Sequence, residues 1–183
     1  MSKLVAKEIF LTKGMGVHQE KLTSYEMALR HASIAPFNIV RVSSIFPPDC
    51  KLIPKDIGLK KLVVGQVLFC VISSSATDKP NHLISSAVGV AIPKDSKQFG
   101  YLSEHHSFSQ TEKIAGNYSE QMAAEMLATM LNIDFDQSQN WDEKQSLFVT
   151  SGQIAKTTNI TQSALTDDRD RWTTVVAAAV LVL

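Results

Sequence analysis

Hydrophobic and polar residues alternate along much of the chain with the two-residue repeat that is typical of β-strands. Segments rich in Val, Ile, Leu and Phe predict strands at residues 6–12, 37–43, 62–73, 82–92, 99–108, 145–154 and 172–183. Glycine, proline and polar residues between them predict turns or loops at residues 13–16, 74–81, 93–97 and 157–170. Prolines 47, 48 and 54 indicate an irregular crossing with a short extended piece at residues 51–53.

Two segments have the helical repeat instead. Residues 22–34 predict a helix that Thr23 and Glu26 begin as a capping box, and Tyr25, Ala28, Leu29 and Ala32 share its apolar face. A second capping box at residues 109–112 predicts a helix that ends near Leu131. We expect one side of this second helix to face the core, with the residues Ile114, Tyr118, Met122, Met126 and Met130.

These elements predict an α+β fold in one domain that spans residues 1–183. Several strands are apolar on both faces, which favours a layered sandwich of mainly antiparallel sheets covered by helices, an αββα-like arrangement. The last strand, residues 172–183, is so apolar that we expect it to lie inside a sheet. A chain of 183 residues is long enough to bury a hydrophobic core.

The amino-acid composition indicates which binding partners and which cellular compartment to expect for this protein. Lys plus Arg and Asp plus Glu both number 18, and a net charge of zero argues against nucleic acid or an anionic membrane as the main partner. The two cysteines, Cys50 and Cys70, are interpreted as free thiols in a reducing compartment. The N-terminus has no apolar signal core, and the apolar residues 175–183 are too few to cross a bilayer. We therefore expect a cytoplasmic protein.

The strongest candidate for chemistry is the serine pair Ser43-Ser44, between an apolar strand and Pro47-Pro48. Proline restricts its own φ and the residue before it, so the backbone here is expected to be held tightly. A hydroxyl beside a held peptide can attack the preceding carbonyl if the fold strains that bond and supplies oxyanion donors. Serine pairs also occur at residues 73–75 and 85–86, so the pair alone does not identify the reaction.

The residues around the pair add a specific resemblance. The segment NIVRVSSIFPP at residues 38–48 is followed in order by SAVGVAIPKD at residues 86–95 and GYLSE at residues 100–104. Together they resemble the pyruvoyl-dependent arginine decarboxylases, over about residues 22–104. Three ordered motifs are a more specific match than any one of them.

The resemblance implies that the chain cleaves itself between Ser43 and Ser44. Residues 1–43 would form a small subunit and residues 44–183 a large one, whose first residue, Ser44, becomes a covalent pyruvoyl group. That group would bind the amine of L-arginine and accept the electrons released as carbon dioxide leaves, giving agmatine. The resemblance implies neither pyridoxal phosphate nor a metal, and the pair His105-His106 has no Cys or further His at ligand spacing.

The resemblance also implies roles for site residues. Glu104, in GYLSE, would deliver a proton to the carbon that loses carbon dioxide; the alternative is a surface glutamate. Asn38 would hold the oxyanion or orient the bound substrate, or else bond a neighbouring loop. Ser43 would line the site. Glu26 would bind the guanidinium of arginine, although the family commonly has aspartate there and a capping role competes.

Family likeness implies a trimer or a dimer of trimers, with sites between neighbouring protomers. Two alternatives stay open: a decarboxylase of the same fold that acts on another amino acid, and an uncleaved, non-catalytic subunit. Agmatine could supply polyamine synthesis, or the reaction could consume protons as a defence against acid.

Overall fold

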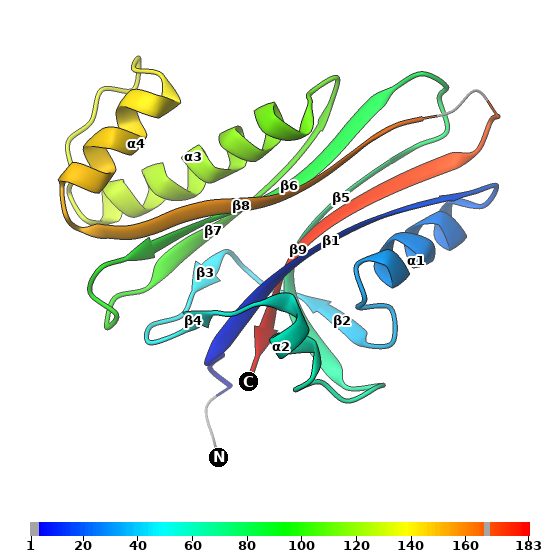
Figure 1. Cartoon of the computed structure of the whole chain (residues 1–183), viewed down its shortest axis with the longest axis horizontal. Helices are drawn as coiled ribbons and strands as arrows, with labels where there is room; N and C mark the ends of the chain where they lie inside the picture. The colour runs from blue at the N-terminus through cyan, green and yellow to red at the C-terminus, as the bar shows by residue number, and fades with distance from the viewer. Residues whose placement is uncertain (1–3, 167–168) are drawn as a thin grey trace.

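Two β-sheets pack face to face in the computed structural model, which describes residues 4–166 and 169–183, and a long helix covers the outer face of each sheet (Figure 1). Sheet A has the strand order β2-β5-β9-β1-β4, and sheet B has the order β3-β7-β6-β8. The pairs are antiparallel except β1 with β4 and β2 with β5. The predicted α+β sandwich is therefore confirmed.

The bounds of the elements are as follows. The strands are β1 (Glu8–His18), β2 (Asn38–Arg41), β3 (Ile45–Phe46), β4 (Lys51–Leu52), β5 (Val67–Thr77), β6 (Leu83–Pro93), β7 (Gly100–Phe108), β8 (Ile154–Leu165) and β9 (Trp172–Val182). The helices are α1 (Lys21–His31), α2 (Lys55–Leu59), α3 (Glu112–Met130) and α4 (Trp141–Thr150).

Apolar side chains fill three layers. Leu68, Cys70 and Val180 pack under α1 on the outer face of sheet A. Val71, Val88 and Leu102 are among the residues that meet between the sheets, and a third cluster lies under α3 and α4. Strand β9 is buried on both faces between β5 and β1, which confirms the expectation for residues 172–183.

Strand β1 runs straight through the turn predicted at residues 13–16. Gly14 and Gly16 lie within the strand under α1, where a Cβ on Gly14 would stand 2.2 Å from the carbonyl oxygen of Ala28. These glycines are needed for the close approach of helix to sheet, so the predicted turn is wrong.

The predicted face of α1 is confirmed, but its predicted start is wrong. Tyr25 and Leu29 pack against the buried cluster on sheet A together with Ala28 and Ala32. The N-cap is Glu20, with no side-chain capping bond, so Thr23 and Glu26 do not form a capping box.

Helix α3 buries a different face from the one predicted. Its N-cap is Thr111, whose side chain accepts the N–H of Ile114, and not Ser109. Of the predicted core residues, Ile114, Tyr118 and Met122 are exposed and Met130 packs against the buried cluster. The buried face consists mostly of small residues, including Ala115, Ser119, Ala123, Ala124 and Ala128. The approach to sheet B is the reason, since a Cβ on Gly89 of β6 would stand 2.2 Å from the carbonyl oxygen of Ser119.

The predicted strand at residues 145–154 and the first part of the predicted loop at residues 157–170 are wrong in type, and residues 167–168 of that loop lie outside the described residues. Residues 141–150 form α4, which begins with a capping box made by Asn140 and Glu143. The predicted loop contains β8, an edge strand with many polar, partly exposed residues. Its composition resembles that of a loop because it is an edge strand whose residues are mostly only partly buried, although it contacts β6, α3 and sheet A.

Strand β5 is displaced relative to its prediction. It covers residues 67–77 and not 62–73, so the first part of the predicted loop at 74–81 is also strand. Cys50 and Cys70 are free thiols, and burial raises the pKa of the Cys70 thiol to about 12, which keeps it protonated and unreactive. Within the described part of the chain, no helix is both long and apolar enough to span a membrane.

Candidate active site

The serine pair joins the two sheets. Strand β2 ends at Arg41, and the N–H of Val42 makes the last bond to sheet A, 3.1 Å from the carbonyl oxygen of Cys70. The chain then crosses to sheet B, where the carbonyl oxygen of Ser44 accepts the N–H of Leu102 at 2.8 Å. Ser43 and Ser44 therefore occupy the crossing from the edge of one sheet to the edge of the other.

A tight turn holds the peptide between the two serines. The N–H of Ile45 donates to the carbonyl oxygen of Ser43 at 3.0 Å, which closes a three-residue turn around Ser44. This donor polarises the carbonyl that the Ser44 hydroxyl would attack, and it lies where negative charge would develop on the oxygen. The tightly held backbone expected from Pro47-Pro48 is present.

Glu104 reaches the same crossing from β7. Its Oε1 accepts the backbone N–H of Ile72 at 3.2 Å. If β2 continued to pair with β5 in parallel, the hydrogen bond after Val42–Cys70 would run from this Ile72 N–H to β2. Because β2 departs here, that donor is left for another acceptor. The carboxylate of Glu104 thus takes the place that β2 leaves open, beside Ser43-Ser44.

The register of β3 with β7 agrees with this placement. Ile45 pairs with Tyr101 and Phe46 with Gly100. Extending that antiparallel register back along the chain places Ser44 opposite Leu102 and Val42 opposite Glu104. The structure therefore brings the serine pair and Glu104 together, as the motifs led us to expect, although their chemical roles stay predictions.

An apolar cavity of about 410 Å³ lies beside the pair. It is lined by Leu4, Val5, Ala6, Val42, Ser43, Ile45, Pro47, Pro48, Phe69, Leu181 and Leu183. Its mostly apolar walls suit an aliphatic chain.

Asn38 is not turned to the serine pair in this structure. It opens β2, about 16 Å of extended chain before Ser43. Its Nδ2 donates to the carbonyl oxygen of Gly65 at 2.7 Å. Asn38 therefore bonds a neighbouring loop, which is the alternative stated from the sequence. A role of Asn38 in the reaction stays a prediction.

Glu26 also lies apart from the serine pair within one chain. Its Oε1 accepts the Nε–H of Arg30, one helical turn away, at 2.6 Å. It lines a separate cavity of about 430 Å³ with Arg30, Ser33, Ala35 and Pro36. Since the capping role is absent, recognition of a guanidinium stays the prediction for this carboxylate.

A larger cavity of about 620 Å³ was not foreseen from the sequence. It is lined by Lys21, Leu22, Tyr25, Arg41, Ser74, Ser75, Ala76 and Thr174. Arg41 donates from Nη2 to Ser74 Oγ at 3.2 Å. The available signal was Arg41 itself, a charged residue in an apolar strand two positions before the serine pair.

The two adjacent histidines do not act together. His105 Nε2 lies 2.9 Å from Gln110 Oε1, and its ring contacts that of Tyr118 at a tilt, with centroids 4.5 Å apart. His106 follows it along β7 and so faces the other side of the strand. Among residues 4–166 and 169–183, no three or more His, Cys, Asp or Glu side chains form a group that could hold a metal ion.

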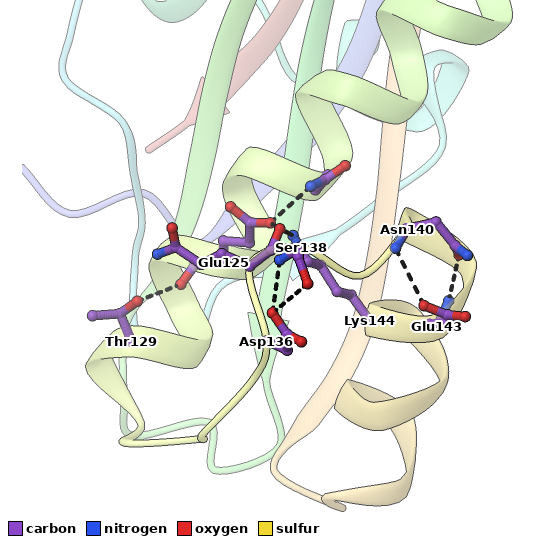
Figure 2. A network of polar contacts seen from close by, with 9 residues as sticks. Glu125, Thr129, Asp136, Ser138, Asn140, Glu143 and Lys144 are labelled. Atoms are coloured by element: carbon purple, nitrogen blue, oxygen red, sulfur yellow. Dashed lines mark hydrogen bonds and ion pairs between the residues drawn. The ribbon is translucent and has the colours of Figure 1, made fainter.

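A separate polar network ties α3 to α4 and β8. Lys144, only 2% exposed, donates from Nζ to Glu125 Oε1 at 2.8 Å and to the carbonyl oxygen of Gln137 at 3.0 Å (Figure 2). Nearby, the buried Glu120 accepts bonds from Thr157 and Asn159 at 2.6 and 2.8 Å. These groups satisfy one another and line none of the cavities near the serine pair.

Comparison with known proteins agrees with the motifs. A family model described as pyruvoyl-dependent arginine decarboxylase matches residues 8–183. A protein of Nitrosopumilus maritimus named pyruvoyl-dependent arginine decarboxylase is 51% identical over the full length of both chains. Pyruvoyl-dependent arginine decarboxylase 2 of Methanosarcina mazei is 46% identical over 98% of each chain. A Chloroherpeton thalassium protein named as a probable member is 51% identical over 97% of this chain and 98% of its own. The chain therefore belongs to the family of pyruvoyl-dependent arginine decarboxylases.

Proposed function

We propose that this protein decarboxylates L-arginine to agmatine and carbon dioxide, with a pyruvoyl group made from its own Ser44. The observation that carries the proposal is the turn in which the Ile45 N–H bonds the Ser43 carbonyl, at a crossing that Glu104 faces. The proposal assigns the roles of nucleophile, polarised carbonyl and carboxylate to Ser44, Ser43 and Glu104.

The proposed cleavage uses atoms of the turn itself. Ser44 Oγ bonds the carbonyl carbon of Ser43 while the peptide C–N bond breaks, and the freed nitrogen of Ser44 takes the hydroxyl proton. The Ile45 N–H stabilises the oxyanion that forms on the Ser43 oxygen. The resulting ester then loses the α-proton of residue 44, and its Cβ–O bond breaks, which frees Ser43 as a carboxylate and leaves a dehydroalanine. Addition of water and release of ammonia complete the pyruvoyl group, at the start of a chain of residues 44–183.

The residues around Ser44 fit such a group. The bond from the Leu102 N–H to the Ser44 carbonyl and the pairing of β3 with β7 anchor the new N-terminus after cleavage. When formed, a pyruvoyl group supplies an electrophilic carbonyl that takes up the electrons released with carbon dioxide. In the proposal Glu104, whose Oε1 bonds the Ile72 N–H, delivers a proton to the substrate carbon.

The remaining assignments require a second copy of the chain. Glu26 and the serine pair line different cavities in one protomer. In the proposal, Glu26 binds the guanidinium of a substrate held at the pyruvoyl group of a neighbouring protomer, within a trimer or a dimer of trimers. Asn38 would have to leave the Gly65 carbonyl to assist the reaction, and Ser43 would line the site with its new carboxylate.

The test is an intact mass measurement under denaturing conditions, followed by an assay for agmatine. We expect two chains that divide after Ser43, with the larger one lighter than residues 44–183 by one ammonia. Arginine should then be converted to agmatine without added cofactor. A single full-length chain after prolonged incubation would overturn the proposal in favour of a non-catalytic subunit.

A second candidate is decarboxylation of another amino acid. The pairing of Glu26 with Arg30 favours it, because a carboxylate that already holds a guanidinium is less available for one from the substrate. Turnover of a panel of amino acids by the cleaved protein separates the two candidates.

A further inference from the structure

The cavity between α1 and β5 opens where sheet A loses a strand. Strand β2 pairs with β5 only as far as Arg41 and Cys70. Beyond that point the edge of β5 carries the Glu104 contact at Ile72, and Ser74, Ser75 and Ala76 line the cavity. The cavity therefore lies along the continuation of the strand that leads to the serine pair.

We propose that this cavity binds the α-carboxylate of the substrate, and that the guanidinium of Arg41 is the group that holds it. This inference rests on the proposed function and deepens it, because it assigns a binding residue to the α-carboxylate, the group that leaves as carbon dioxide. The cavity volume of about 620 Å³ accommodates an amino acid.

Charge supports an anionic ligand. Arg41 and Lys21 line the cavity, and none of its described lining residues is acidic. Lys21 also lies 4.8 Å from the centre of the Trp172 ring, which holds its ammonium group at the cavity wall. A basic amino acid would be repelled through its side chain and attracted through its carboxylate, so the cavity orients the substrate.

Spacing along β5 relates the cavity to the chemistry. Arg41 bonds the side chain of Ser74, and Glu104 bonds the backbone of Ile72, two residues earlier. Two residues of strand span about 7 Å, so the two contact points on β5 lie within the length of an amino acid of each other. The carboxylate would lie against Arg41 while Glu104 faces the carbon to be protonated.

The chemistry of the guanidinium suits this role. The bond to Ser74 uses one of its five N–H donors, and the planar fork matches a carboxylate better than a lysine ammonium does. Because carbon dioxide leaves, this contact exists with arginine and is lost with agmatine. Arg41 therefore strengthens binding of substrate over product and assists product release.

The first experiment compares Arg41→Met with wild-type protein, with Lys156→Met on the exposed part of β8 as a matched loss of one charge. We expect the KM for L-arginine to rise about 10- to 100-fold, in line with a charged hydrogen bond, and kcat to change less. Inhibition by agmatine should change less than about twofold. The KM of Arg41→Lys for L-arginine should fall between those of the wild type and Arg41→Met. Equal weakening of arginine and agmatine, or of neither, would overturn the proposal.

A second experiment requires no variant and no turnover. Calorimetric titration of the wild-type protein compares D-arginine with its amide, which lacks the negative charge. We expect the acid to bind about tenfold more tightly, and the difference to shrink as salt rises. Equal affinities would overturn the role of the cavity. An uncleaved chain in the mass measurement would instead overturn the proposed function, and cleaved protein that binds D-arginine more tightly than its amide but does not convert L-arginine to agmatine would overturn only the choice of substrate.

Discussion

Two carboxylates near sheet B, Glu104 on β7 and Glu120 on α3, have contrasting surroundings. Glu104 is exposed at the open edge of β5, and the bond described for it is one backbone N–H at 3.2 Å. Glu120 is only 8% exposed, and three side chains donate to it: Thr157 at 2.6 Å, Asn159 at 2.8 Å and Gln145 at 3.4 Å.

The difference separates a carboxylate that can react from one that organises the fold. Glu120 accepts hydrogen bonds from neutral donors on α4 and β8, so it links these elements to α3. The bond described for Glu104 fixes the direction of its carboxylate and leaves other acceptor sites open. If Glu104 is the reacting carboxylate, as proposed, burial alone would indicate the wrong residue.

The largest effect is expected from a change that leaves both carboxylates in place. Ser44→Ala removes the hydroxyl that would attack Ser43, so we expect no cleavage and no agmatine above background. Intact mass and an agmatine assay measure this. Ser85→Ala, in another serine pair of the same chain, is the control and should be cleaved normally. Agmatine production by Ser44→Ala would show that Glu104 acts without a pyruvoyl group.

Glu104→Gln tests the reactive side of the comparison. The amide oxygen can still accept the Ile72 N–H, so cleavage and thermal stability should stay near wild type. The amide cannot deliver a proton, and kcat should fall by about 10²- to 10⁴-fold. Steady-state kinetics of fully cleaved protein measures this, and a kcat within threefold of wild type would remove Glu104 from the mechanism.

The elements around Glu104 were predictable from sequence, and so was α3, the helix that carries Glu120; α4 and β8, which supply the donors to Glu120, were not. Strand β6 is a well-defined apolar segment, β6 and β7 overlap the second and third motifs, and the crossing at Ser43-Ser44 is marked by its prolines. Strand β8 is an edge strand of mixed polarity, so its period is weak. The α4 segment has a short apolar run that also fits a strand, although the capping box of Asn140 and Glu143 is typical of a helix start.

Two features of the site depend on tertiary structure that periodicity does not encode. The cavity at Arg41 exists because β2 stops there while β5 continues, which depends on strand pairing. On α3, the apolar ridge of Ile114 and Tyr118 is adjacent to the alanine face, and only the close approach at Gly89 selects the small residues for burial.

Glu26 is a third carboxylate, exposed and paired on its own helix with Arg30. Glu26→Gln removes its charge, and if it binds the substrate guanidinium the KM for arginine should rise about tenfold or more. Stability should change by less than about 1 kcal/mol, because exposed ion pairs contribute little. Kinetics on arginine and citrulline, a neutral analogue, separates lost charge recognition from general damage. An unchanged KM would contradict the assignment of Glu26.

Glu120→Gln should have the smallest effect on catalysis and sharpens the comparison from its structural side. The substitution keeps the shape but replaces one acceptor oxygen with an N–H₂ group that faces the donors of Asn159 or Thr157. A buried donor left without an acceptor costs about 1–3 kcal/mol of unfolding free energy. Urea denaturation at fixed protein concentration should show that loss, while kcat on cleaved protein stays within about twofold of wild type. Glu104→Gln is expected to lose kcat and keep its stability, and Glu120→Gln to lose stability and keep kcat. The two variants together therefore decide whether free acceptor sites, and not burial, distinguish the reacting carboxylate. A large loss of kcat in Glu120→Gln, with unfolding unchanged, would reverse the assignment.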